Sequence, residues 1–137
     1  MNLARVYARL SIDEDRRKRI YTDTVGKISG GVGRNLTDRG FRDDEIDLML
    51  TNDVAEAIGE CRRLFRGFDS ISEVRQEVLV NMMFNMGYAR LAGFKKMVAA
   101  VQANNWREAA VQMLDSKWAD QVGDRADRLA DAMRTGA

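Results

Sequence analysis

The chain has 137 residues, of which 45% are hydrophobic and 31% are charged, and its formal net charge is +1. This length fits one domain that can bury a core, and the composition is that of an ordinary soluble globular protein. Histidine is absent and Cys61 is the single cysteine, which excludes histidine-dependent catalysis, an internal disulfide and the commonest ligands of catalytic zinc. We therefore expect no metal and no cofactor, and carboxylates are the natural acid and base if the chain is an enzyme.

Charge and hydropathy also restrict the partners. A net charge near zero argues against a dedicated nucleic-acid binder. No apolar run reaches the roughly 18 residues of a membrane span, so stable membrane insertion is not expected. The N-terminal residues lack the charged-then-apolar pattern of a secretory signal, which predicts a cytoplasmic location. Residues 15–39 carry seven basic and three acidic side chains, whereas residues 42–60 carry one basic and seven acidic ones. This asymmetry could attract an anionic polymer to one face, or it could consist of two solvated faces.

The first half of the chain predicts helix, hairpin and helix in turn. Apolar residues at helical spacing, from Leu3 to Leu10, predict a short N-terminal helix. Four glycines within residues 22–36 would each weaken a helix by about 1 kcal/mol relative to alanine, so a glycine-rich β-hairpin is predicted there. Helical periodicity returns over residues 42–65, with a break expected near Thr51 and Asn52 because both are good helix caps.

The second half predicts helices only. Ser70 and Glu73 have the spacing of a capping box, and they precede a helix that is apolar nearly all round and ends at Gly87. Further helices are predicted over residues 91–102, 106–114 and 124–133. The fold class is therefore α+β, mainly helical, with one small β region near the N-terminus.

Three polar residues of the first half are candidates for catalysis. Glu14 could belong to a capping box that starts at Ser11, or it could lie at the frayed end of the first helix and pair with Lys18 or an arginine. Asp23 is typical of a turn aspartate, and Ser29 could be a plain hairpin residue. Alternatively, Glu14 and Asp23 could face each other across a groove as the two carboxylates of a glycoside hydrolase, with Ser29 holding the attacking water. Local sequence leaves both interpretations open.

The spacing of these residues has a counterpart in a known family. Its pattern is Glu, eight residues, Asp, five residues, Thr, and here Glu14, Asp23 and Ser29 stand at those intervals. Further motifs follow in the family's order: Ile12-Asp13-Glu14, Ile20-Tyr21, Phe68-Asp69-Ser70, the segment NMMFNMG from Asn81 to Gly87, Gly93-Phe94, Trp106-Arg107-Glu108, Ser116-Lys117-Trp118 and Arg134-Thr135-Gly136. The chain thus resembles the bacteriophage-type lysozymes (endolysins, muramidases) of glycoside hydrolase family 24, whose best-known member is of the T-even coliphage type. Many weak motifs in one order are more specific than any one alone.

The resemblance implies a two-lobed fold within a single lysozyme domain over residues 1–137. A small β-containing lobe (14–50) would be joined by a connecting helix (51–65) to a helical lobe (1–13 and 66–137). The N-terminal helix would pack onto the helical lobe, and the cleft between the lobes would bind peptidoglycan.

The resemblance also implies roles for individual residues. Glu14 would be the general acid, Asp23 the second carboxylate, and Ser29 would replace the threonine that positions water. Phe84 and Asn85 would line the substrate cleft from the helical lobe, and Arg125 would lie near the acid and orient it. Gly30 stands where the family usually has an apolar residue, Arg34 stands where many members have histidine, and one short helix of the small lobe is missing.

The implied activity is hydrolysis of the β-1,4 bond between N-acetylmuramic acid and N-acetylglucosamine, with inversion of configuration. A phage endolysin is the expected context. The protein would be a monomer that accumulates in the host cytoplasm and reaches the periplasmic wall after membrane permeabilisation, with a holin as the expected partner for release. Two alternatives stay open, namely a lytic transglycosylase and a non-catalytic wall-binding protein with a lysozyme fold.

Overall fold

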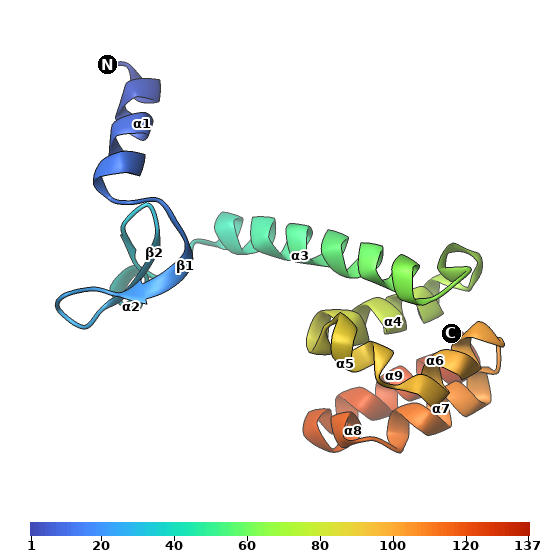
Figure 1. Cartoon of the computed structure of the whole chain (residues 1–137). Coiled ribbons are helices and arrows are strands. Elements are labelled where there is room, and N and C mark those ends of the chain that lie inside the picture. Colours follow the sequence, from blue (N-terminus) through green and yellow to red (C-terminus); the bar gives the residue numbers. More distant parts are fainter. The chain divides into compact units, whose positions relative to one another are not determined.

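The computed structural model describes all residues from 1 to 137 and contains nine α-helices, one 3-10 helix and three short strands (Figure 1). The predicted α+β, mainly helical class is confirmed. The chain forms two compact units, Met1–Leu48 and Met49–Ala137, which are described separately below. The predicted division into lobes, with residues 1–13 in the helical lobe, stays a prediction.

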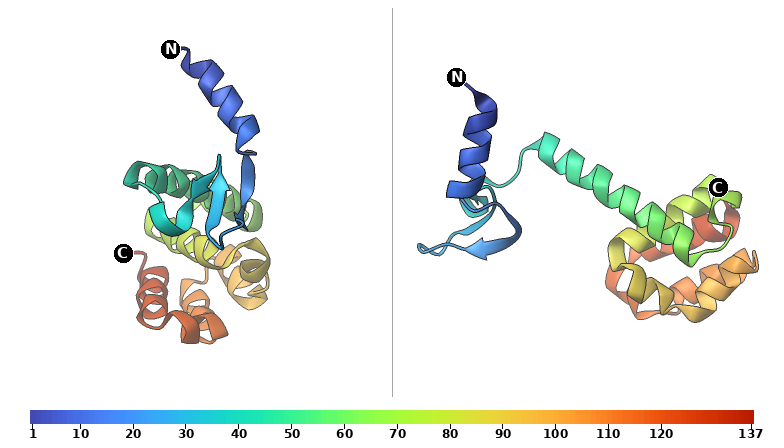
Figure 2. Two further views of the ribbon diagram at one scale, coloured as in Figure 1. Left: turned by 90° about the vertical axis from the view of Figure 1, so that its left-hand side faces the viewer. Right: turned by 45° about the horizontal axis from the view of Figure 1, so that its top comes forward.

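The first unit contains a short helix and a small sheet. Helix α1 (Leu3–Asp13) begins at Asn2, whose side chain accepts a hydrogen bond from the Arg5 amide at 3.1 Å. Strands β1 (Arg17–Thr22), β2 (Ile28–Gly31) and β3 (Arg34–Asn35) form an antiparallel sheet in the order β1-β2-β3, with a bulge in β1 (Figure 2). Helix α2 (Leu36–Arg39) follows β3 directly and contacts β2 and β3. The predicted glycine-rich hairpin is therefore present, with its turn at residues 23–27.

Helix α3 (Asp43–Leu64) is continuous for 22 residues, so the break predicted at Thr51 and Asn52 is wrong. Asp43, Asp44 and Glu45 lie in its first turn and two arginines lie in its last turn. These charges stabilise the helix, because they interact favourably with the helix dipole at both ends. Good capping residues do not interrupt a helix when the residues on both sides continue its periodicity, because cap preference is weaker than the sum of the flanking contacts.

The second unit is entirely helical. After the end of α3 it contains the 3-10 helix η1 (Phe68–Ser70), α4 (Glu73–Met86), α5 (Tyr88–Ala92), α6 (Lys95–Gln102), α7 (Trp106–Leu114), α8 (Lys117–Val122) and α9 (Asp124–Thr135). Helix α7 has the predicted bounds, and α9 starts where predicted. Helices α2 and α8 were not predicted.

Two helix predictions in this unit are wrong. The cap of α4 is Ser72, whose Oγ accepts from the Arg75 amide at 3.4 Å, whereas Ser70 ends the 3-10 helix. The single helix predicted over residues 91–102 is divided into α5 and α6, because Gly93 closes the first and Phe94 precedes the second. Ser70 and Ser72 are both residues that favour the N-cap position, so local sequence does not decide where α4 begins.

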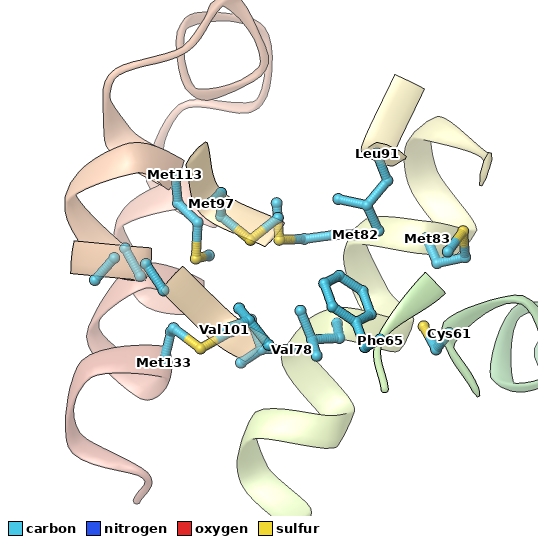
Figure 3. Packing of buried hydrophobic residues seen from close by; sticks show 14 of the residues in the cluster. Cys61, Phe65, Val78, Met82, Met83, Leu91, Met97, Val101, Met113 and Met133 are labelled. Carbon is cyan, nitrogen blue, oxygen red and sulfur yellow. The ribbon is translucent and has the colours of Figure 1, made fainter. Parts of the chain in front are cut away.

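The helical unit has one apolar core, to which α4 contributes most (Figure 3). Val78, Leu79, Met82, Met83 and Met86 of α4 are buried, and Phe65, Leu91, Met97, Met113, Trp118 and Met133 pack around them. The sequence predicts that α4 is apolar nearly all round. The structure differs, because the other side of the helix exposes Asn81, Phe84 and Asn85. This exposed side carries the two predicted substrate-binding residues. None of the helices combines the length and the apolarity that crossing a membrane would need.

Candidate active site

Glu14 stands where α1 ends and the chain turns toward β1. Its amide donates to the Leu10 carbonyl at 2.9 Å, and the next residue, Asp15, has a φ of +55°. Ser11 lies inside α1, so the capping-box interpretation is wrong and Glu14 is the C-terminal cap of the helix. The ion pairs of this unit do not include Glu14, so the predicted pair with Lys18 or an arginine does not form.

The Glu14 carboxylate lies against the backbone of Gly33, which separates β2 from β3. A Cβ atom at Gly33 would come within 2.5 Å of Oε2 and 3.0 Å of Cδ of Glu14. Gly33 also has a φ of +64°, in the region that favours glycine. The absence of a side chain at this position therefore makes room for the carboxylate, a role of Gly33 that the sequence did not indicate.

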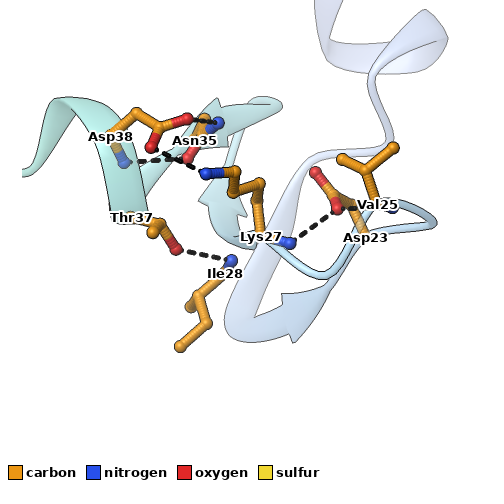
Figure 4. A network of polar contacts seen from close by, with 7 residues as sticks. All are labelled: Asp23, Val25, Lys27, Ile28, Asn35, Thr37 and Asp38. Carbon is orange, nitrogen blue, oxygen red and sulfur yellow. Dashed lines mark hydrogen bonds and ion pairs between the residues drawn. The ribbon is translucent and has the colours of Figure 1, made fainter.

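Asp23 occupies the turn between β1 and β2, and its side chain is held by the turn itself. Its Oδ1 accepts hydrogen bonds from the Val25 amide at 3.0 Å and the Lys27 amide at 2.8 Å (Figure 4). The interpretation of Asp23 as a turn aspartate is thus confirmed, and it is compatible with catalysis. Both bonds go to Oδ1, so the carboxylate has its second oxygen to offer to a water molecule.

Ser29 lies in β2 with 4% of its surface exposed, opposite Tyr21 in β1 and Asn35 in β3. Asp23 comes two residues after Tyr21, and its backbone amide donates to the Lys27 carbonyl across the turn. Side chains two residues apart along an extended strand point to the same face, and strand alternation carried one residue past the end of β1 predicts that Asp23 lies on the face of Tyr21 and Ser29. We therefore expect the predicted second carboxylate and the predicted water-positioning hydroxyl to lie at the same end and on the same face of the hairpin.

Side chains from α2 form hydrogen bonds and an ion pair with this hairpin (Figure 4). Thr37 Oγ1 accepts from the Ile28 amide at 2.8 Å, and Asp38 Oδ1 accepts from Lys27 Nζ at 3.1 Å. Asn35 donates to Asp38 Oδ2 at 2.8 Å and, through its Oδ1, caps α2. The strand that holds Ser29 is therefore supported on its β3 side by directional polar contacts.

Arg34 and Glu45 form an ion pair between β3 and the first turn of α3. Both side chains are about one quarter exposed, less than those of the other ion pairs in this unit. The hydrogen bond from Arg34 lowers the pKa of the Glu45 carboxyl below its ordinary value, and the Arg42 backbone amide adds to this effect. The sequence did not indicate this partner, since the family resemblance implied only that Arg34 replaces a histidine.

In the helical unit, Phe84 and Arg125 line one groove of about 750 Å³ along α3 and α4. Phe84 is 46% exposed, so it is not simply a core residue. Arg125 donates to Oδ1 of Asn81 through Nε at 3.0 Å and Nη2 at 2.7 Å. Asn81, the first residue of the NMMFNMG segment, thus holds the guanidinium of Arg125 within this unit, a contact that the sequence did not indicate.

Asn85 has a structural contact that the sequence did not indicate. Its Oδ1 accepts a hydrogen bond from Nε1 of Trp118 at 2.9 Å, and Trp118 is buried. A buried indole N–H needs an acceptor, but sequence alone does not say which residue supplies it. The proposed substrate contact of Asn85 therefore has to involve the rest of its amide group.

The Cys61 thiol and possible metal ligands are the other groups of the chain that could take part in a reaction. Burial raises the pKa of the Cys61 thiol to about 12, which agrees with the buried position of this residue in the core. No group of three or more acidic, histidine or cysteine side chains is arranged to hold a metal ion. Carboxylates and the Ser29 hydroxyl therefore remain the candidate reactive groups of the chain.

Comparison with known proteins gives an independent line of evidence. The family model described as phage lysozyme matches residues 12–133, which include Glu14, Asp23, Ser29, Phe84 and Arg125. The chain is 23% identical over 156 aligned positions to "Probable T4-type lysozyme 2" of Dictyostelium discoideum, covering 93% of this chain and 92% of that protein. "Probable T4-type lysozyme 1" of the same organism is 24% identical with the same coverage. The "Pre-baseplate central spike protein Gp5" of Enterobacteria phage T4 is 30% identical over 152 positions, which cover 90% of this chain and 26% of that protein.

Proposed function

The chain belongs to the phage lysozyme family, and we propose that it hydrolyses the β-1,4 bond between N-acetylmuramic acid and N-acetylglucosamine in bacterial peptidoglycan, with inversion of configuration. Family membership makes it a lysozyme-type hydrolase whose substrate is peptidoglycan. The bond that is cleaved, the stereochemistry and the biological context are the proposed part.

The observation that supports this mechanism best is the arrangement of the hairpin. Asp23 and Ser29 are expected on one face, and Asp23 is oriented by two backbone amides. In the proposed reaction, Glu14 donates a proton to the glycosidic oxygen as that bond breaks. Asp23 and Ser29 orient a water molecule that attacks the anomeric carbon from the opposite face of the sugar, and Asp23 accepts the proton of that water.

The helical unit contributes binding in this proposal. Phe84 is exposed on α4, where its ring can stack on the apolar face of a sugar. Asn85 contacts the glycan strand through the part of its amide group that Trp118 does not engage. Arg125, held by Asn81, supports the general acid as the family resemblance implies. These three roles follow from the resemblance.

The experiment compares the release of reducing ends from purified Gram-negative peptidoglycan by the wild type, Glu14→Gln and Asp23→Asn. The control is Asp13→Asn, which removes an equally exposed carboxylate next to Glu14. We expect Glu14→Gln and Asp23→Asn to lose about 100-fold or more of the activity, because acid–base groups contribute roughly 10²–10⁴-fold each. Asp13→Asn should retain the wild-type rate, and circular dichroism should show all variants folded. Full activity in Glu14→Gln would contradict the proposed acid.

The products distinguish the two alternative functions. Anhydro-muropeptides in place of reducing ends would assign the protein to the lytic transglycosylases, which use one acid–base carboxylate. Sedimentation with peptidoglycan without any product would instead indicate a wall-binding protein with a lysozyme fold. Mass spectrometry of the soluble fragments decides among the three outcomes.

We further propose that the protein is a monomeric endolysin, which remains in the host cytoplasm until a holin permeabilises the membrane. The support is the family membership, because the family model that matches residues 12–133 is that of the phage lysozymes. Fractionation of cells that express the protein with and without a holin tests this point. Periplasmic protein in the absence of the holin would contradict it, and size-exclusion chromatography with light scattering tests the monomer.

A further inference from the structure

The ion pair of Arg34 with Glu45 lies between the sheet and the beginning of α3. Arg34 is in β3, opposite Gly30 of β2, and Glu45 is the third residue of α3. The two residues are eleven positions apart in the sequence, and the pair spans the loop that connects α2 to α3. It therefore joins the sheet to a helix of 22 residues.

Both neighbours of Arg34 in the chain contact predicted catalytic groups. Gly33, on one side, lies against the Glu14 carboxylate. Asn35, on the other side, is the strand partner of Ser29. A displacement of Arg34 therefore moves the surface on which Glu14 rests and the strand that aligns Ser29.

Glu45 is itself held in place at the start of α3. Its Oε1 accepts a hydrogen bond from the Arg42 amide at 3.1 Å, which is the contact that a glutamate at the third helical position makes in a capping box. The Arg42 guanidinium also approaches Oε1 at 3.3 Å, and the same guanidinium lies 3.7 Å from Asp44. The second oxygen, Oε2, is the one that binds Arg34. Glu45 thus uses one oxygen for the helix and the other for the sheet.

We propose that Arg34 and Glu45 are positioning residues of the active site, whose ion pair fixes the β2–β3 connection against Glu14 and Ser29. This inference rests on the proposed function for its kinetic consequence, whereas the positional coupling itself does not depend on it. The pair acts through Gly33 and Asn35, so it affects the turnover step and leaves ground-state binding largely unchanged. Misplacing a catalytic group by about 1 Å can lower the rate by about 100-fold.

The variants separate the ion pair from the helix cap. Glu45→Gln removes the charge but keeps an oxygen that can accept from the Arg42 amide, and Arg34→Met removes the cation at similar length. Arg34→Lys keeps the cation. The matched control is Asp44→Asn, which removes one negative charge from the same turn of α3 at a residue that contacts Arg42 and not Arg34.

The kinetic test measures kcat and KM for peptidoglycan hydrolysis. Glu45→Gln and Arg34→Met should each lower kcat by roughly 10-fold or more with KM changed less than about twofold, whereas Arg34→Lys and Asp44→Asn should stay close to the wild type. The double variant Arg34→Met/Glu45→Gln should be no slower than the slower single variant, since both changes remove one interaction. Equal kcat in Glu45→Gln and the wild type, or additive effects in the double variant, would overturn the proposal.

A second readout tests the positional coupling without activity. Amide resonances of Glu14, Gly33 and Asn35 should shift or broaden in Glu45→Gln, and they should remain unchanged in Asp44→Asn. If these resonances do not respond, the proposal is wrong whatever the kinetics show. If the wild type releases no fragments from peptidoglycan while the resonances respond as expected, the proposed function fails and the positioning role stands.

Discussion

Gly33→Ala is the most direct test of the geometry around Glu14. The added methyl group would lie 2.5 Å from Oε2 of Glu14 and 3.0 Å from its Cβ and Cδ atoms. Atoms do not approach this closely without a collision, so the carboxylate or the β2–β3 connection has to move. Oε2 and Cδ lie toward the end of a side chain that can rotate, whereas Cβ is fixed by the backbone of Glu14. We therefore expect the carboxylate to move, the β2–β3 connection to shift slightly and the fold to persist.

Gly31→Ala is the matched control, which separates the effect of the left-handed backbone from the effect of the contact with Glu14. Gly33 has a φ of +64° and Gly31 has a φ of +63°, but a Cβ at Gly31 meets no atom within 4 Å. Both alanine variants should therefore lose about 1–2 kcal/mol of stability from the left-handed backbone. Only Gly33→Ala should also lose activity, by about 100-fold in kcat if the carboxylate moves by about 1 Å.

The assay pairs thermal unfolding with the release of reducing ends. We expect similar melting temperatures for Gly31→Ala and Gly33→Ala, both below that of the wild type, and near-normal kcat for Gly31→Ala alone. If Gly33→Ala is as active as Gly31→Ala, the position of the Glu14 carboxylate in the structure does not matter for catalysis. That result would refute the argument that Gly33 is kept free of a side chain for Glu14.

Three further predictions concern other residues. The Cys61 thiol, buried and with its pKa raised to about 12, should not react with a thiol reagent at pH 8 until the protein is unfolded, and rapid labelling of the native protein would contradict this. Asn85→Ala removes the acceptor of the Trp118 indole N–H and should lower the stability to denaturant by about 1–3 kcal/mol; an unchanged midpoint would mean that another acceptor replaces it. The folded-state pKa of Glu45 is lowered, so its contribution to stability should be present above its ordinary pKa of 4.5 and be lost as the pH falls through the lower folded value; Glu45→Gln should therefore flatten the acid side of the melting profile, and parallel profiles would refute this.

The parts of the fold that were predictable depend on contacts close in sequence. The spacing of apolar residues predicted α1, α7 and α9, and the glycines of residues 22–36 predicted the hairpin, because periodicity and backbone freedom act locally. The errors occurred where several local signals compete. Ser70 and Ser72 are both good caps for α4, and Ser72 is the one that is used. Thr51 could have started a helix, but helical periodicity on both sides of it continues α3 without a break.

The same distinction applies to the candidate site. The orientation of Asp23 comes from amides two and four residues away, so its turn chemistry could be expected from the sequence. The contact of Asn85 with Trp118 spans 33 residues, and that of Asn81 with Arg125 spans 44. No periodicity or propensity specifies such pairs, because they depend on how the helices pack. The family resemblance identified several of these positions, but the structure was needed to show what each side chain contacts.

The two units differ in what holds them together. Taken by itself, the first unit buries only Ser29 and Gly30, whereas the second unit has a continuous apolar core. Asp23 and the β2–β3 connection of the first unit are therefore positioned by hydrogen bonds and an ion pair, each worth about 0.5–1.5 kcal/mol at most and less when exposed. Such contacts are directional, so they define the orientation of Asp23 and of the β2–β3 connection, but losing one of them leaves the core of the helical unit intact. For this reason we expect substitutions at Gly33 and Glu45 to lower kcat far more than they lower the overall stability of the protein.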